Sequence, residues 1–179
     1  MKKIIYVFLL VILLTGCGEI SNTPTKQVEG FLNKYQTLDQ NVLDDLEQVI
    51  LEEEKFDELN KQKYRDVVKR QYQDLIYYVK EERVDGNKAV VTVEITVYDF
   101  ANTMVEAENY KNNHISEFND ENGLFSQVKY IDYVIEQLNK TKEKVKYTID
   151  LSLTKTDDKW KLDGLDSDTE DKILGVYEK

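Results

Sequence analysis

Residues 91–98, with the sequence VTVEITVY, decide the fold class because apolar side chains occupy every second position. An extended strand turns successive side chains to opposite faces, so the apolar set would share one face. The apolar set is Val91, Val93, Ile95 and Val97, and the alternate set is Thr92, Glu94, Thr96 and Tyr98. This pattern predicts a strand of an antiparallel sheet with one buried face.

The segment 75–79 shows the same alternation, and Asp-Gly-Asn at 85–87 predicts a hairpin turn between the two segments. A three-residue loop ending at Gly86 or Asn87 places the apolar side chains of both strands on one face. A two-residue loop would instead place Lys80 and Glu82 among the valines. We expect the three-residue loop, because a one-residue slip exchanges the buried set for the polar one.

A second hairpin is predicted over residues 145–162, where polar and apolar side chains alternate again around Thr156-Asp157-Asp158. An even-membered loop brings Trp160 opposite Leu153 and Leu162 opposite Leu151. The apolar side chains of the longer strand are Val145, Tyr147, Ile149, Leu151 and Leu153. The chain therefore contributes at least four strands to one sheet.

Helical spacing of apolar residues predicts three helices before the first hairpin, beginning near Thr23-Pro24, near Asp39 or Asn41, and near Glu54. Residues 101–142 return to this spacing in two pieces, separated by a loop at 119–123, and a short helix follows over 167–174. The buried side chains of the three N-terminal helices and of the two inserted helices include Val28, Leu32, Tyr35, Leu46, Val49, Ile50, Leu59, Tyr64, Val67, Val68, Tyr72, Met104, Val105, Val128, Val134 and Ile135. This order predicts an α+β fold with helices packed on the apolar face of the sheet.

Composition excludes several classes of protein. The 179 residues include one Cys and one Pro, so a disulfide scaffold or a proline-rich linker is ruled out. The formal net charge of −11 argues against nucleic-acid binding, which requires a basic surface. With 41% hydrophobic residues the chain can bury a core.

The first residues have the form of an export signal. Lys2 and Lys3 precede the apolar run 4–14, which is too short to span a bilayer. Residues 14–17, Leu-Thr-Gly-Cys, resemble the lipobox of bacterial lipoproteins. This resemblance implies that residues 1–16 are a signal peptide, that Cys17 carries a thioether-linked lipid, and that 17–23 form a short tether to the cell membrane. Cleavage would leave 163 residues with a formal charge of −13 on the extracytoplasmic face, and would leave no free thiol.

Residues 24–179 then form a single α+β domain. The stretches TPTKQVEGFLNKYQTLD (23–39), KRQYQDL (69–75), VTVEITVYDF (91–100) and KVKYTIDLSLTKTDDKWKLDGLD (144–166) resemble uncharacterised lipoproteins of low-GC Gram-positive bacteria. Their arrangement is similar to the NTF2-like, cystatin-like superfamily. The resemblance implies N-terminal helices on a curved antiparallel sheet, with 101–142 as a helical insertion between the two hairpins.

Catalytic and metal-binding groups are scarce. The only histidine, His114, falls at a predicted helix end, and no second His or free Cys completes a zinc site. The acidic residues within 166–171 are spaced like the start of an EF-hand loop. The segment lacks the glycine and the final glutamate that such a loop requires. We therefore expect no metal and no cofactor.

One carboxylate remains as a catalytic candidate. The NTF2-like resemblance implies a carboxyl group deep between sheet and helices, and Asp99 continues the inward-facing positions of the strand. A solvated turn or a helix N-cap suits Asp99 better than a catalytic role, because it stands where the strand ends. Asp132 is a second candidate of the same kind.

Tyrosine is unusually frequent, with 12 in the chain. Rings with polar tips suit an apolar pocket that offers hydrogen bonds, and they equally suit an ordinary core. The candidate pocket residues are Tyr77, Tyr130, Tyr133, Tyr147 and Trp160. The resulting hypothesis is a lipid-anchored, non-catalytic module that binds an unknown envelope protein or a small apolar ligand. The alternative is an NTF2-like hydrolase or isomerase that uses Asp99.

Overall fold

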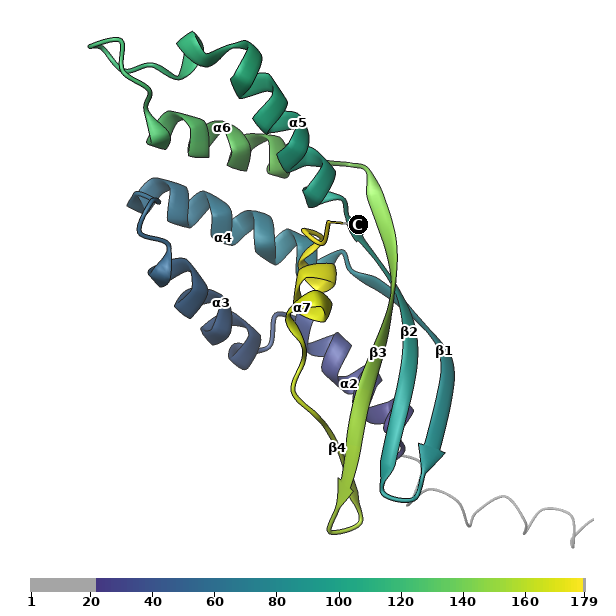
Figure 1. The fold of residues 1–179 in the computed structure, drawn as a ribbon. Coiled ribbons are helices and arrows are strands. Elements are labelled where there is room, and N and C mark those ends of the chain that lie inside the picture. The colour runs from purple at the N-terminus through teal and green to yellow at the C-terminus, as the bar shows by residue number, and fades with distance from the viewer. Residues whose placement is uncertain (1–21, 179) are drawn as a thin grey trace, which may run out of the picture.

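A computed structural model of the chain describes residues 22–178. Four antiparallel strands form one sheet in the order β1 (Ile76–Asp85), β2 (Lys88–Tyr98), β3 (Lys144–Thr156) and β4 (Lys159–Leu162), as Figure 1 shows. Side chains of β2 alternate between buried and half-buried along the strand, as the period of two predicts. The α+β class and the antiparallel sheet are confirmed, whereas the NTF2-like, cystatin-like assignment stays a prediction.

The α-helices begin at residues that cap them. They are α2 (Pro24–Gln36), α3 (Gln40–Glu52), α4 (Glu58–Gln73), α5 (Phe100–Asn113), α6 (Gln127–Lys140) and α7 (Ser167–Leu174), with a 3-10 turn η1 (Ile115–Phe118). The Thr23 side chain accepts a hydrogen bond from the backbone N–H of Lys26, as expected for an N-cap. Helix α4 begins later than the predicted Glu54, because Asp57 is its N-cap.

The first hairpin differs from the predicted register. Asp85 pairs with Lys88, so the loop has two residues, and Gly86 adopts a φ of +57°. That loop places Glu82 opposite Val91, on the apolar face. A β-bulge at Lys80 then shifts the register by one residue, so that Tyr77 and Val79 face the core as predicted. The sequence pattern was right for the buried residues and wrong for the loop.

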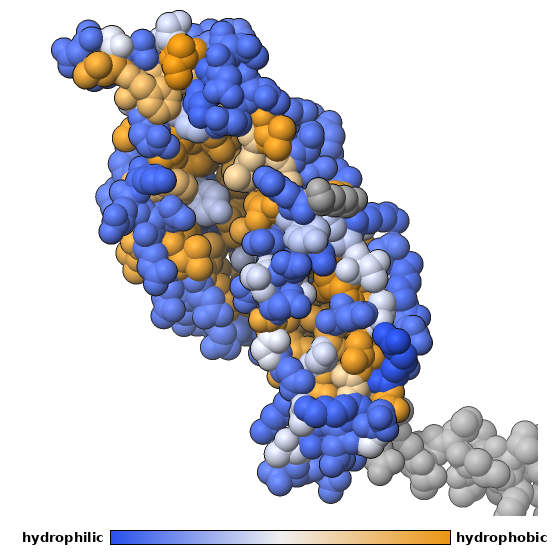
Figure 2. All heavy atoms as spheres, in the orientation of Figure 1, coloured by the Kyte–Doolittle hydropathy of each residue, from blue (hydrophilic) through white to orange (hydrophobic). Residues whose placement is uncertain are grey.

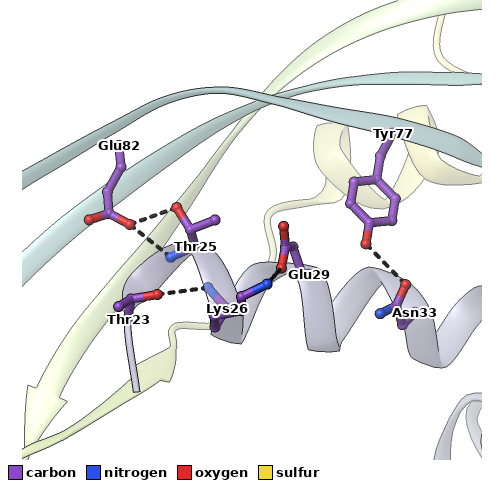
Figure 3. A network of polar contacts seen from close by, with 7 residues as sticks. All are labelled: Thr23, Thr25, Lys26, Glu29, Asn33, Tyr77 and Glu82. Atoms are coloured by element: carbon purple, nitrogen blue, oxygen red, sulfur yellow. Dashed lines mark hydrogen bonds and ion pairs between the residues drawn. The ribbon is translucent and has the colours of Figure 1, made fainter. Parts of the chain in front are cut away.

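The polar side chain of Glu82 is accommodated by the N-terminus of α2, as Figure 3 shows. Its carboxylate accepts hydrogen bonds from the backbone N–H of Thr25 at 2.9 Å and from the Thr25 hydroxyl at 2.6 Å. The positive end of a helix dipole favours an anion at this position. The Tyr77 hydroxyl, near the start of β1, donates to Oδ1 of Asn33 at 3.0 Å. These hydrogen bonds hold α2 against β1.

The second hairpin turns one residue later than predicted. Asp157 and Asp158 form the two-residue loop with φ values of +51° and +59°, and Leu153 lies opposite Leu162. Trp160 lies opposite Lys155 rather than Leu153. The shift of two in pairing leaves every side chain on its predicted face, because the side-chain period is two.

Two helices cover the apolar face of the sheet. Helix α2 contacts β1, β2 and β4, and α7 contacts β2 and β3. We expected all three N-terminal helices on this face, but α3 packs on α4, and α4 packs mainly on α2, α3, α6 and α7. In Figure 1, α5 and α6 lie at the upper end of the sheet, and α3 and α4 lie to one side of it, beyond α7. The inserted helices α5 and α6 supply a second apolar surface, and α4 covers it.

Several side chains assigned to the buried helix faces are in fact exposed. Val49 and Leu59 are 55% and 58% exposed, and Met104, Val105 and Val128 are 44–48% exposed. The periodicity identified each helix correctly but made its apolar stripe too wide. The surplus apolar residues become surface, and two of them line the groove described below.

A buried glutamine joins α4, β2 and α7. Gln71 has no solvent exposure, and its side-chain amide donates to the backbone oxygens of Tyr98 at 3.0 Å and Leu174 at 2.6 Å. Its carbonyl accepts from the N–H of Tyr98 at 2.9 Å. Gly175 follows with a φ of +80°, and a Cβ there would lie 2.2 Å from both the Gln71 amide nitrogen and the Tyr98 oxygen. Only glycine fits this position.

Candidate functional site

An apolar groove of about 530 Å³ lies between α4, α5, α6 and the C-terminal segment that follows α7. Helix α6 contributes one wall through a stripe of side chains at helical spacing. The residues of this wall are Tyr130, Ile131, Val134, Ile135 and Leu138. Figure 2 shows hydrophobic side chains gathered in a hollow over these helices. We call this feature the helical groove.

The opposite wall comes from α5, from an aromatic ring in the α3–α4 connection and from a second ring on α4. Phe100, Met104 and Val105 project from α5, while Phe56 and Tyr64 meet edge to face with ring centroids 5.3 Å apart. Phe100 is 2% exposed, whereas Met104 and Val105 are 44% and 48% exposed. The groove thus has a buried floor and an open side.

Polar groups stand at the rim. The Tyr130 hydroxyl donates to Oε2 of Glu108 at 2.8 Å, and Lys111 donates to Oε1 of the same carboxylate at 2.5 Å. Burial raises the pKa of the Tyr130 phenol, and the hydrogen bond to Glu108 raises it further. The hydrogen bond from Lys111 lowers the pKa of Glu108. At neutral pH the rim therefore carries a neutral phenol held on an ionised carboxylate, with Glu53 and Glu178 also at its edge.

The groove contains no arrangement typical of nucleophilic or metal-assisted catalysis. Its lining is apolar apart from tyrosine hydroxyls, three glutamates and an asparagine. Within residues 22–178 no group of three or more His, Cys, Asp or Glu side chains is placed to hold a metal ion. His114 is exposed at the end of α5, where it stacks on Tyr110 with ring centroids 4.1 Å apart.

The five candidate pocket residues fall into two groups. Tyr77, Tyr147 and Trp160 pack in the hydrophobic core between the sheet and α2 and α7. The Tyr147 hydroxyl donates to the backbone oxygen of Tyr177 at 3.1 Å, and Trp160 is 8% exposed. These three rings share the inner face of the sheet, as predicted, and they are core residues there.

Tyr130 and Tyr133 lie on α6 and do not cover that face, contrary to the expectation. Their neighbours are the aromatic rings of α5 and η1, with Tyr133 stacked on Tyr110 at 5.0 Å and in contact with Phe118 at 5.3 Å. Helix α6 packs on α4 and α5. The five residues therefore do not form one pocket; of them, Tyr130 lines the helical groove.

The two candidate carboxylates have structural partners. Asp99 caps α5, and its side chain accepts a hydrogen bond from the N–H of Asn102 at 3.0 Å. Asp132 pairs with Lys63 across the α4–α6 interface. The helix-cap interpretation of Asp99 accounts for its position, and its catalytic role stays a prediction. Cys17, the predicted lipidation site, lies outside the described residues.

Sequence reasoning missed the residues that matter most to the groove. The helical spacing predicts Met104 and Val105 as buried, whereas both are exposed on the groove wall, and no local signal in the sequence distinguishes the two cases. Gln71 lies outside the groove, and its burial could have been predicted from the sequence. It follows Val67 and Val68 at the spacing of the apolar stripe of α4. A glutamine in that position indicates a buried polar contact.

Comparison with known proteins identifies the N-terminus. Residues 1–17 match the prokaryotic membrane lipoprotein lipid attachment site. The chain is therefore a lipid-anchored membrane lipoprotein, and within residues 22–178 no helix is long and apolar enough to cross a bilayer. A search of curated protein sequences found no match.

A solved structure gives a weaker likeness. The chain is similar to the ycdA protein of Bacillus subtilis strain 168, also described as a lipoprotein, with 13% identity and a TM-score of 0.43. The similarity covers 85% of this chain and 47% of that one, so this chain spans about half the length of ycdA.

Proposed function

We propose that this protein is an extracytoplasmic lipoprotein that binds a small apolar ligand in the helical groove without chemically changing it. The groove itself is the observation that supports binding. Its volume of about 530 Å³ falls within the range of small-molecule sites, and its walls are apolar with a few polar groups at the rim. The residues along it provide no nucleophile and base pair, which favours binding over catalysis.

The anchor is the second part of the proposal. Residues 1–16 would be removed and Cys17 would carry the lipid, in keeping with the match to residues 1–17. Asn22 is fixed at the β3–β4 turn, where its side-chain oxygen accepts from the N–H of Trp160 at 3.1 Å. Four residues separate Asn22 from Cys17, so the five Cα–Cα steps between them span at most about 17 Å. The hairpin end would then face the bilayer and the helical end, seen in Figure 1, would point away from it.

Ligand binding can be tested with N-phenyl-1-naphthylamine, an uncharged apolar dye, and the chain lacking residues 1–17. We expect saturable fluorescence enhancement. Val105→Lys should weaken binding about tenfold or more, because it places a charge on the groove wall. Val84→Lys is the matched control, since Val84 is 52% exposed on β1 and lies outside the groove. Equal binding by both variants, or no saturable binding, would contradict the proposal.

The anchor can be tested in cells by metabolic labelling with a radioactive fatty acid. The wild-type protein should carry label and sediment with membranes, whereas Cys17→Ser should carry none. Label retained on the serine variant would show that the lipid is attached elsewhere. Protease added to intact spheroplasts should digest the protein if it lies on the extracytoplasmic face, and protection would place it inside.

A further inference from the structure

A second cavity, of about 340 Å³, lies between α3, α4 and α7 and is walled by tyrosine rings and carboxylates. Tyr35 projects from α2, and Tyr64 and Tyr72 project from α4. The carboxylates are Asp45 on α3 and Glu170 and Asp171 on α7. Tyr64 also lines the helical groove, so its ring belongs to the wall of both sites. We call this second feature the tyrosine cavity.

Two of the three rings that line the tyrosine cavity are in contact with each other. Tyr35 and Tyr72 meet edge to face with centroids 4.9 Å apart, at an interplanar angle of 82°. The faces of aromatic rings carry negative electrostatic potential and attract cations, most strongly where water is excluded. Both rings are only partly exposed. Below them the floor is apolar, with Leu46 and Ile173 among its side chains.

The carboxylates of the cavity lack cationic partners. Among the residues that the structure describes, Asp45, Glu170 and Asp171 form no ion pair with lysine or arginine, whereas Glu47 on the same helix as Asp45 pairs with Arg65. Their negative charge reaches the ring hydroxyls. Burial, assisted by the charges of Glu170 and Asp45, raises the pKa of the Tyr35 phenol to about 12. An uncompensated negative charge beside three aromatic rings attracts a positively charged ligand.

We propose that the tyrosine cavity binds a small organic cation, with an ammonium group between the rings and the three carboxylates. The apolar floor and the aromatic walls suit the alkyl substituents of a quaternary ammonium group, a ligand that aromatic cages recognise. The volume of about 340 Å³ is at the low end for small-molecule sites and suits a compact ligand. A bare metal ion is not favoured, because the residues that the structure describes include no metal-binding cluster. This inference does not depend on the helical groove.

The test uses the full chain purified in an uncharged detergent and titrated by calorimetry at constant ionic strength. The probe is choline, and its uncharged isostere 3,3-dimethylbutan-1-ol is the control ligand. We expect choline to bind saturably and the alcohol to bind about tenfold more weakly or not at all. Equal affinity for the two ligands would show an ordinary apolar cavity and would overturn the proposal. Absence of choline binding up to about 10 mM would overturn it as well.

A pair of double variants separates the cavity from the general acidity of the surface. Asp45→Asn with Glu170→Gln should weaken choline binding about tenfold, because it removes two charges from the cavity wall. Asp44→Asn with Asp168→Asn removes the same charge from the same two helices but outside the cavity, and should leave affinity within about twofold. All four positions are exposed, so folding should be retained. Equal losses in both double variants would show non-specific attraction and would refute the site.

Discussion

The bonds of Gln71 give the sharpest prediction about the stability of this fold. Its side chain satisfies the N–H and the oxygen of Tyr98 and the oxygen of Leu174, and all three bonds are shielded from water. Gln71→Met keeps the length of the side chain and removes every one of these bonds. The variant therefore lacks the side-chain hydrogen bonds that join α4 to the end of β2 and to the C-terminus of α7.

The magnitude follows from the number of bonds lost. Each hydrogen bond contributes about 1 kcal/mol net, and a buried backbone group left unpaired costs about 1–3 kcal/mol. Since each carbonyl keeps a second acceptor site and some gaps will relax, we expect a loss of about 3–5 kcal/mol in the free energy of unfolding. With a urea m-value of about 2 kcal/mol/M, the midpoint should fall by about 2 M.

Urea unfolding followed by circular dichroism measures this loss. Gln73→Met is the matched control, because Gln73 is exposed near the end of the same helix. The control should change stability by less than about 0.5 kcal/mol. A loss below about 1 kcal/mol for Gln71→Met would refute the reasoning, because it would mean that water or another group replaces these bonds.

Three further predictions concern single residues. Gly175→Ala should destabilise the protein severely, because its Cβ would lie 2.2 Å from the Gln71 amide nitrogen and from the Tyr98 backbone oxygen. Gly164→Ala is the control and should be tolerated, because nothing lies within 4 Å of a Cβ there. Thermal unfolding of the two variants compares their stability. The Tyr35 phenol ionises near pH 10 when unfolded and near 12 when folded, so stability is lost as pH rises through this window. Tyr35→Phe should lose less between about pH 9 and pH 11 in urea titrations, and an equal loss would argue against the shift. The pKa of Glu47 is lowered by its hydrogen bond from Arg65, so its contribution is present above the unfolded pKa of 4.5 and lost on acidification. Because Glu47 is 41% exposed, Glu47→Gln should cost less than about 1 kcal/mol at neutral pH, and this deficit should shrink as the pH falls below 4.5; a deficit that does not shrink on acidification would exclude the ion pair as its cause.

The first hairpin shows how far local pattern extends. Alternation correctly placed Tyr77 and Val79 on the apolar face, opposite Ile95 and Val93 of β2, because a buried face tolerates only one parity. The same reasoning excluded a two-residue loop, since it would put Glu82 among apolar residues. The structure has that loop, because Thr25 from a helix 57 residues away supplies hydrogen bonds to Glu82 and a bulge at Lys80 restores the parity. No local signal announces such a partner.

The candidate site shows the limit more plainly. Tyr130 and Trp160 were grouped because both are aromatic and lie on apolar faces, but the packing of α6 on α4 and α5 puts them in different clusters. The periodicity of a helix identifies which side is apolar and does not identify the surface that covers it. The helical groove and the tyrosine cavity both arise from that choice of neighbours, with Tyr64 between them.

The amino-acid sequence by itself determined the export and lipid-attachment signal, the strands and helices, and which strand residues are buried, because these depend on residues close together along the chain. The tertiary structure alone decided which helices cover the sheet, how Gln71 and Gly175 hold the C-terminus of α7 against β2, and where apolar and aromatic side chains form a groove and a cavity. Such features depend on contacts between segments as far apart as Gln71 and Leu174, whose meeting depends on the packing of the whole chain.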